Sequence, residues 1–378
     1  MERFAPARIL LQDGVVEAVG LASDIRIPPG ATVLDAGDST VVPGFIEPHI
    51  HGCGGVDVMA GTFDALNTIS RVLARHGTTT FLPTTVSSAP EVLGAAVEQL
   101  GALINKSSDK SFDGAQPAGI HLEGPFINDL KRGTHRADNI LAPDAALLSD
   151  WIRRSSNAIR LLTIAPELPG IGDLIQLADR SGIRVAMGHS DASYAEAMAA
   201  VERGVCYAVH TFNAMRAFTH RDPGIVGAVL TDDRVFAEII ADGVHVTPEV
   251  IRIFARTKPR DRVLLVTDAT SATGMPDGQY LLGKQTVDVV DGVCRDAEGR
   301  LAGSTLTQDA ALRNFVAWTG DGLQNALFGL TLNPAEALKL EGRGRIEPGA
   351  RADLVMLDSD FHVMKTFVTG KLVFERHA

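Results

Sequence analysis

The residues of this chain best suited to chemistry are histidines and carboxylates that follow apolar, strand-like runs. His49 and His51 stand two apart in PGFIEPHIHG, so on a strand both imidazoles would share one face and could reach one ion. Four further candidates, each at the end of a later apolar run, are Glu123, His189, His210 and Asp268. Singly, each has an ordinary explanation, because a buried Glu can pair with an Arg and an Asp can cap a helix. Together they predict a divalent-metal site that suits Zn²⁺, Fe²⁺, Mn²⁺ or Co²⁺, and the residues alone do not choose among these ions.

The elements that must position these residues form a regular alternation. Apolar runs predict strands at 44–52, 78–85, 118–124, 160–167, 184–190, 206–214, 236–245 and 262–269. Stretches rich in Ala, Leu and Glu predict helices at 90–105, 170–181, 192–203 and 247–256. Eight strand–helix units indicate an α/β fold of the closed (β/α)8 TIM-barrel type, in which the ends of the strands meet at one mouth. A doubly wound sheet is the alternative, but the chain lacks the glycine-rich nucleotide turn of that fold.

Both termini are rich in short strand patterns separated by turn signals. We therefore expect residues 1–42 and 336–378 to form one small β-sandwich domain beside a metal-dependent barrel domain at 43–335. Segment 278–304 predicts a β-hairpin insertion that turns at Asp291-Gly292 and again near Glu298-Gly299, then returns to the barrel mouth.

Composition narrows the classes of function. The chain has 378 residues with a formal charge of −11, which argues against general nucleic-acid binding. No apolar run is long enough for a membrane span or a secretory leader. Three scattered cysteines predict reduced thiols rather than disulfides, so we expect a soluble, cytoplasmic protein.

In order along nearly its whole length, the chain resembles the N-acetylglucosamine-6-phosphate deacetylase family of the amidohydrolase superfamily. The shared motifs include PGFIEPHIHGCGG (43–55), HLEGPFIN with KRGTH (121–135), HTFNAMRAFTHRDPGIVGA (210–228), TDATSATG (267–274) and LAGSTLT (301–307). HLEGPF, and HTFNAM followed by RDPG, are the most specific of these.

The resemblance implies roles for the metal ligands. Glu123, His189 and His210 would hold the ion that every active member binds. Glu123 would also bridge to a second ion held by His49 and His51. Some relatives lack this histidine pair and use one metal, so its presence here predicts two ions per subunit rather than one.

The chemistry itself assigns two more residues. Amide hydrolysis needs a group that takes a proton from water and then delivers it to the amine, and Asp268 is placed to do both. The developing oxyanion needs a positive partner, for which a metal and His135 are candidates. By resemblance His135, next to Thr134 in KRGTH, contacts the acetamido part of the substrate.

The resemblance also implies a phosphate site and a homodimer. Asn213 and Ala214 would contribute from a loop whose N–H groups could point at an anion, while Arg221 and His245 would reach into the neighbouring subunit's site. Three further residues that would line the sugar are Leu301, Ala302 and Gly303. Nearby Lys131, Arg216 and His220 are expected to be solvent-exposed charges.

The activity implied is hydrolysis of N-acetyl-D-glucosamine 6-phosphate to D-glucosamine 6-phosphate and acetate. Deacetylation of N-acetyl-D-galactosamine 6-phosphate or another acylated amino sugar, and a non-catalytic scaffold, are the alternatives. Glu47 stands where relatives often have Asp, which would change only the packing behind the ligands. The fourth strand run ends in Pro166-Glu167 without lysine, unlike amidohydrolases that bridge two metals with a carbamylated lysine. Cys53 could be a thiolate ligand, although its Gly-Cys-Gly-Gly context favours packing in a tight turn.

Overall fold

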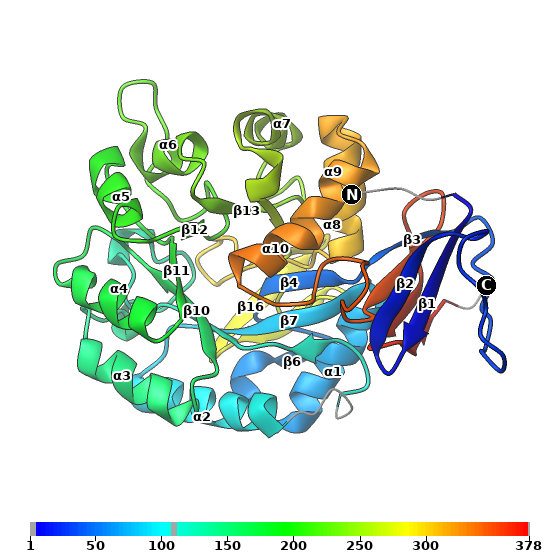
Figure 1. Cartoon of the computed structure of the whole chain (residues 1–378). Coiled ribbons are helices and arrows are strands. Elements are labelled where there is room, and N and C mark those ends of the chain that lie inside the picture. The colour runs from blue at the N-terminus through cyan, green and yellow to red at the C-terminus, as the bar shows by residue number, and fades with distance from the viewer. Residues whose placement is uncertain (1–4, 107–111, 377–378) are drawn as a thin grey trace.

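A ring of parallel strands surrounded by helices forms the centre of the computed structural model, which describes residues 5–106 and 112–376 (Figure 1). The barrel strands, which neighbour one another in chain order, are β4 (Phe45–Ile50), β7 (Thr78–Thr85), β9 (Ile120–Glu123), β10 (Ile159–Ile164), β11 (Arg184–Met187), β12 (Tyr207–Ala208), β13 (Phe236–Ile240) and β14 (Val263–Val266). Short β8 (Gln116–Pro117) pairs with β7 at one side. The predicted eight-stranded barrel is therefore confirmed.

The ring closes where the first strand meets the last. Ile50 and Ala269 form a parallel bridge, and the N–H of His51 donates to the carbonyl oxygen of Ala269 at 2.8 Å. The N–H of Asp268 donates to the oxygen of His49 at 3.1 Å. Closure of the barrel thus brings the histidine pair of the first strand beside the aspartate that follows the eighth.

Burial explains why these segments form strands. All six residues of β4 and all eight of β7 are buried, as expected of parallel strands covered on both faces. The helices around the ring are α1 (Phe63–Arg75), α2 (Pro90–Lys106), α3 (Ala145–Arg154), α4 (Ile171–Arg180), α5 (Tyr194–Val201), α6 (Gly224–Thr231), α7 (Pro248–Thr257), α8 (Gln308–Thr319), α9 (Leu323–Leu330) and α10 (Leu332–Ala337). Polar caps define several starts; for example, Ser193 and Glu196 form a capping box that begins α5.

The four predicted helices correspond to α2, α4, α5 and α7. The predicted insertion is a three-stranded antiparallel sheet of β15 (Gly278–Leu282), β16 (Gln285–Val290) and β17 (Val293–Arg295). Its second turn is Asp291-Gly292, both with positive φ. As expected, the chain then returns to the mouth, where the N–H of Ser304 donates to the oxygen of Asp268 at 2.8 Å.

The strands of the two chain ends lie together on one side of the barrel (Figure 1). β3 (Thr40–Pro43) pairs with β18 (Leu354–Leu357), which continues to β19 (Val363–Val368) and β20 (Lys371–Glu375). β1 (Ala7–Gln12) and β2 (Val15–Leu21) form a separate hairpin. It joins the C-terminal segment through a bridge between Val15 and Arg351. The termini therefore meet as expected, while the boundaries at residues 42 and 336 stay a prediction.

Within residues 5–106 and 112–376, no helix is long and apolar enough to cross a membrane. The cysteines, all three in these ranges, are free thiols. The expected cytoplasmic location stays a prediction.

Candidate metal centre and active site

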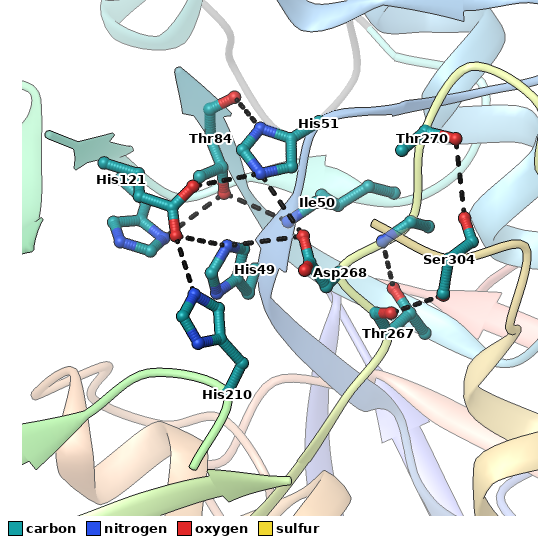
Figure 2. A network of polar contacts seen from close by, with 12 residues as sticks. His49, Ile50, His51, Thr84, His121, His210, Thr267, Asp268, Thr270 and Ser304 are labelled. Atoms are coloured by element: carbon teal, nitrogen blue, oxygen red, sulfur yellow. Dashed lines mark hydrogen bonds and ion pairs between the residues drawn. The ribbon is translucent and has the colours of Figure 1, made fainter. Parts of the chain in front are cut away.

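Side chains from four strand ends meet at the carboxylate of Glu123 at the barrel mouth; Figure 2 labels His49, His51 and His210 among them. Oε1 lies 3.2 Å from Nε2 of His49, 3.2 Å from Nε2 of His210 and 3.5 Å from Nε2 of His189. Oε2 lies 3.2 Å from Nε2 of His51. All five side chains are buried. The structure thus brings together every residue predicted as a metal ligand.

The hydrogen bonds on the far side of three histidines show which ring nitrogens face the centre with a lone pair. Nδ1 of His49 lies 2.9 Å from the carboxylate of Glu238. Nδ1 of His51 lies 3.1 Å from the carbonyl of Thr84, and Nδ1 of His189 lies 2.9 Å from that of Lys131. These partners only accept, so each Nδ1 donates and each neutral ring presents an unprotonated Nε2.

Positive charge between the members of such an arrangement would stabilise it. Nε2 of His49 has no hydrogen-bond partner among the described residues, and the Nε2 atoms of His189 and His210 lie only 3.1 Å apart. Buried imidazole and carboxylate acceptors that converge in this way suit a borderline divalent cation. These residues therefore fit the predicted metal, with one group around Glu123, His189 and His210 and another around His49 and His51.

Charge within the cluster also shifts its protonation. Burial lowers the pKa of His51, but hydrogen bonds with Asp268 and Glu123 outweigh burial and raise this pKa to about 9. Without a cation the two carboxylates therefore favour a proton on this ring, which a bound metal ion would displace to give the neutral ligand form. Burial lowers the pKa of His189 to about 4, which keeps the ring neutral, as a ligand must be. Burial raises the pKa of Glu123, yet the histidines around it bring that pKa well below its usual range.

Two buried carboxyl groups lie beneath the cluster: Glu47, which is predicted from the sequence to pack behind the ligands, and Glu238, which the sequence did not indicate. Glu238, on β13, accepts from Nδ1 of His49 at 2.9 Å, from the hydroxyl of Tyr207 at 2.7 Å and from the N–H of His210 at 3.0 Å. Glu47, on β4, accepts from the N–H of His49 at 3.1 Å and from that of Thr267 at 3.2 Å. Burial raises the pKa of Glu47 to about 8. Glu238 sits in a strand run, where the sequence offers no signal that an inward Glu will reach a histidine on another strand. Glu47 instead contacts His49 on its own strand.

His121 is a further buried histidine that sequence reasoning did not single out. Its ring lies edge-on to His49 at 4.7 Å between centroids (Figure 2). Its Nε2 lies 2.7 Å from the hydroxyl of Thr163. Burial, together with the charge of His49, lowers the pKa of His121 well below its usual value. It packs behind the ligands as a neutral ring.

His135 differs from the predicted ligand histidines in which ring nitrogen carries the hydrogen. Its Nδ1 accepts the N–H of Ser87 at 3.1 Å, so in the neutral ring Nε2 carries the hydrogen. That Nε2 lies 3.5 Å from Oε2 of Glu123. Glu123, His135 and His189 are close enough to hold an ion, but this hydrogen makes His135 a donor into the site rather than a ligand.

Asp268 completes the cluster from the end of the eighth strand. Its Oδ1 lies 3.3 Å from Nε2 of His51 and 3.6 Å from Nε2 of His49. Burial raises the pKa of Asp268, but His49 and His51 outweigh it and hold this pKa well below its usual range. Asp268 has φ +51, as do His189 at +48 and His210 at +28. Such backbone conformations are costly for residues with a Cβ and gather at functional sites.

Gly303, predicted to line the sugar, lies directly against Asp268. Its φ is +63, and a Cβ there would stand 2.7 Å from the carbonyl oxygen of Asp268. Ala302 is fully buried in a cluster with the insertion sheet, so only its backbone can face a ligand. Leu301 is half-buried, and the oxygen of Thr134 accepts from Nε2 of Gln285 at 2.7 Å.

The predicted phosphate residues lie outside the cluster. The N–H of Asn213 donates to the oxygen of His210 at 2.9 Å, and its side-chain amide donates over longer distances to the oxygens of His210 at 3.4 Å and Thr211 at 3.5 Å. Ala214 follows with φ +51. Arg221 is exposed and has no ion-pair partner among the described residues. Nδ1 of His245 lies 2.6 Å from Oδ2 of Asp242, so Nε2 is the ring nitrogen left for a ligand.

Two residues expected to be free surface charges are instead tied into the loops. Arg216 donates to Asp222 through two nitrogens at 2.9 and 2.7 Å, and Lys131 lies 3.3 Å from Asp191. Acidic side chains in the same loop, Asp222, or in a neighbouring loop, Asp191, explain the difference. His220 is exposed, as expected. Cys53 is fully buried at 3.7 Å from the oxygen of Ile69, in keeping with packing rather than ligation.

Comparison with known proteins agrees with this geometry. Residues 40–373 match the family described as the Amidohydrolase family. The chain is 40% identical to an N-acetylglucosamine-6-phosphate deacetylase of Vibrio furnissii over 96% of this chain and 92% of that protein. It is 37% identical to an N-acetylgalactosamine-6-phosphate deacetylase of Escherichia coli O157:H7 over 97% of this chain and 94% of that protein.

A similar solved structure is the N-acetyl-D-glucosamine-6-phosphate deacetylase of Mycobacterium smegmatis, an aspartate-to-alanine variant in complex with N-acetyl-D-glucosamine 6-phosphate. It has a TM-score of 0.90 and 36% identity over 97% of this chain and 94% of that one. The chain therefore belongs to the amidohydrolase family, among its N-acetylglucosamine-6-phosphate deacetylases and their relatives.

Proposed function

We propose that this chain hydrolyses the acetamido group of N-acetyl-D-glucosamine 6-phosphate, giving D-glucosamine 6-phosphate and acetate. One observation carries the proposal. Unprotonated imidazole nitrogens converge on Glu123, with a proton acceptor, Asp268, beside His51 and a proton donor, His135, beside Glu123. The intact set also argues against a non-catalytic scaffold.

The metal would be held at two positions that share Glu123. One position uses His189 and His210, and the other uses His49 and His51. A divalent ion supplies Lewis acidity and lowers the pKa of water at the site towards neutrality. Zn²⁺ is the ion we favour, and Fe²⁺, Mn²⁺ and Co²⁺ suit the same donors.

Two residues would handle protons and developing charge. Oδ1 of Asp268 takes the proton from the attacking water as the new C–O bond forms at the acetamido carbon. Nε2–H of His135 donates to the oxygen of that carbon as it gains negative charge. Asp268 then delivers its proton to the amine nitrogen as the C–N bond breaks, which releases acetate and the free amine.

The rest of the substrate would be held around the mouth. Arg221 would pair with the phosphate through its planar guanidinium, assisted by Asn213, Ala214 and His245. The sugar would contact Thr134 and the backbone of the segment 301–303. In that segment Gly303 has no side chain and lies against Asp268.

A second substrate deserves direct comparison. The relative at 37% identity acts, by its name, on N-acetylgalactosamine 6-phosphate, against 40% for the glucosamine enzyme. These sugars differ in the orientation of one hydroxyl group, which one or two contacts can discriminate.

The test is acetate release from purified, zinc-loaded protein with each of the two phosphorylated sugars and with unphosphorylated N-acetylglucosamine. We expect the highest kcat/KM on N-acetylglucosamine 6-phosphate. An inert mixture would refute the proposal, and equal turnover of the unphosphorylated sugar would remove the phosphate site. The Asp268→Asn variant, purified in the same way, controls for a contaminating hydrolase.

We also propose a homodimer in which Arg221 and His245 serve the partner's site. Phe218, beside Arg221, is 54% exposed and Val244, beside His245, is 44% exposed, as expected of surfaces that a second copy covers. Light scattering tests the dimer. Mixing Arg221→Ala subunits with Asp268→Asn subunits tests the sharing. If Arg221 acts across the interface, about half of the randomly mixed dimers contain one subunit of each kind, and each of these has one complete site of two. Mixing then restores about a quarter of the activity. If Arg221 acts within its own subunit, no activity returns.

A further inference from the structure

The carboxyl group of Glu167 lies at the barrel rim between two loops that carry predicted metal ligands. In the barrel, β10 lies between β9 and β11 and pairs with both. β9 ends at Glu123, and His189 comes shortly after β11. Glu167 follows the end of β10 by three residues, where the loops from both neighbouring strands pass it.

Hydrogen bonds join this one carboxylate to both loops. Oε1 accepts from Nδ2 of Asn128 at 2.9 Å, in the loop after β9, and from the N–H of Asp191 at 2.7 Å, in the loop after β11. Oε2 accepts from the hydroxyl of Ser190 at 2.7 Å. Every partner is a donor, so only a group with several acceptor sites satisfies them all.

The same two loops hold His189. Its carbonyl oxygen accepts from the N–H of Asn128 at 2.9 Å, and its Nδ1 donates to the oxygen of Lys131 at 2.9 Å. Asn128 also caps the short turn Asp129–Lys131 that presents this oxygen. His189 has φ +48, a conformation that a residue with a Cβ keeps only when its surroundings fix it. Glu167 therefore holds both loops that restrain His189: the loop after β9 through Asn128, and the loop after β11 through Ser190 and Asp191.

We infer that Glu167 is a positioning residue that aims Nε2 of His189 at Glu123 and His210, and so sets the affinity of the ion held by these three. The inference rests on the proposed metal site but not on the identity of the sugar. Glu167 touches none of the three directly. It acts through the loops, as residues behind metal ligands commonly do.

The test is a Zn²⁺ titration against a chromophoric chelator, in a His51→Ala background that leaves only the Glu123, His189 and His210 position. Glu167→Ala should weaken zinc binding by about 10–100-fold. Glu167→Gln should recover most of that loss, because its amide oxygen can accept from Asn128 and Asp191 while its NH₂ group meets the hydroxyl of Ser190, which can also accept.

A matched control separates positioning from general stability. Asp309 is a buried carboxylate that, like the half-buried Glu167, has several donors, in this case His76, Thr307 and Arg313 within 2.9 Å. It lies at the opposite end of the barrel, since His76 precedes β7. Asp309→Asn should lower the melting temperature without changing zinc affinity. If Glu167→Ala binds zinc as tightly as this control does, the inference is wrong.

Two further measurements keep the test decisive. Should Glu167→Ala fail to fold, Ser190→Ala removes one of the three contacts and should weaken zinc binding severalfold; unchanged binding would overturn the inference. With the His51 side chain restored and zinc saturating, Glu167→Ala should lower kcat and leave KM nearly unchanged. If the parent chain hydrolyses none of the sugars, the proposed function fails while the zinc titration still decides the role of Glu167.

Discussion

Replacing Glu238 by Gln tests whether the carboxylate beneath the cluster supports one metal position more than the other. Three donors point at Glu238: Nδ1 of His49, the N–H of His210 and the hydroxyl of Tyr207. In the variant, the amide oxygen can accept from the first two, while the NH₂ group donates to the oxygen of Tyr207. The side chain keeps its size and its hydrogen bonds, so the perturbation is the loss of one negative charge.

The expected size follows from the kind of bond lost. A hydrogen bond to a charged group contributes about 1.5–3 kcal/mol and a neutral one about 0.5–1.5 kcal/mol. The difference of about 1–1.5 kcal/mol corresponds to roughly a tenfold change in affinity. That is the lower end of the 10–100-fold range for removing such a partner. The zinc affinity of the His49 position should fall by this factor, because only there does Glu238 contact the ring of a predicted ligand.

Zinc titrations in two single-site backgrounds provide the assay. His189→Ala leaves the position of His49 and His51, where Glu238→Gln should weaken zinc about tenfold. His51→Ala leaves the other position, which Glu238 supports only through the backbone of His210, and the loss there should be smaller. Tyr207→Phe is the matched control, since it removes a neighbour of Glu238 and keeps the charge. Equal losses at both positions, or the same loss from Tyr207→Phe, would refute the reasoning.

Further predictions concern the reaction, the substrate and stability. Asp268→Asn should lower kcat by about 10²–10⁴-fold with little change in KM, measured as acetate release; a wild-type kcat would remove Asp268 from the mechanism. Arg221→Ala should mainly raise KM for the phosphorylated sugar, and a change confined to kcat would contradict its role at the phosphate. Gly303→Ala should lower kcat and the melting temperature together, because its Cβ would meet the oxygen of Asp268 at 2.7 Å and its φ is +63. Burial raises the pKa of Asp309, but His76, Thr307 and Arg313 outweigh it and hold this pKa below its usual range. The contribution of Asp309 to the free energy of unfolding is therefore full above about pH 4 and falls as the pH drops further. Urea unfolding should show that the free energy of unfolding falls less steeply with pH in this range for Asp309→Asn than for the parent chain.

The barrel could be predicted because its physical causes are local. Parallel strands buried on both faces must be apolar throughout, and such runs stand out in sequence even where the strand is short, as in β12. The ligands were visible for a related reason. Each follows an apolar run directly, and the fold brings all such positions to one mouth.

The residues behind the ligands could not be predicted, because pairing between distant strands selects them. Glu238 reaches His49 across 189 positions of sequence. Two of the ligand histidines are oriented by backbone carbonyl oxygens, of Thr84 and Lys131, which any residue type supplies. The sequence marks Glu167 only as a position without the lysine of other amidohydrolases. Its role emerged from the two loops that pass it.

Asp268 and His135 lie on different sides of the site, which would orient a bound acetamido group. Oδ1 of Asp268 contacts Nε2 of His51 at 3.3 Å, whereas the ring of His135 packs edge-on to His189 at 4.7 Å. The proposed proton acceptor therefore adjoins one proposed metal position and the proposed proton donor adjoins the other, and both positions share Glu123. An acetamido group held across Glu123 would have its carbonyl oxygen beside His135 and its attacking water beside Asp268. Closure of the barrel fixes this order, because it joins the first strand to the eighth and so fixes Asp268 beside His51 rather than beside His189.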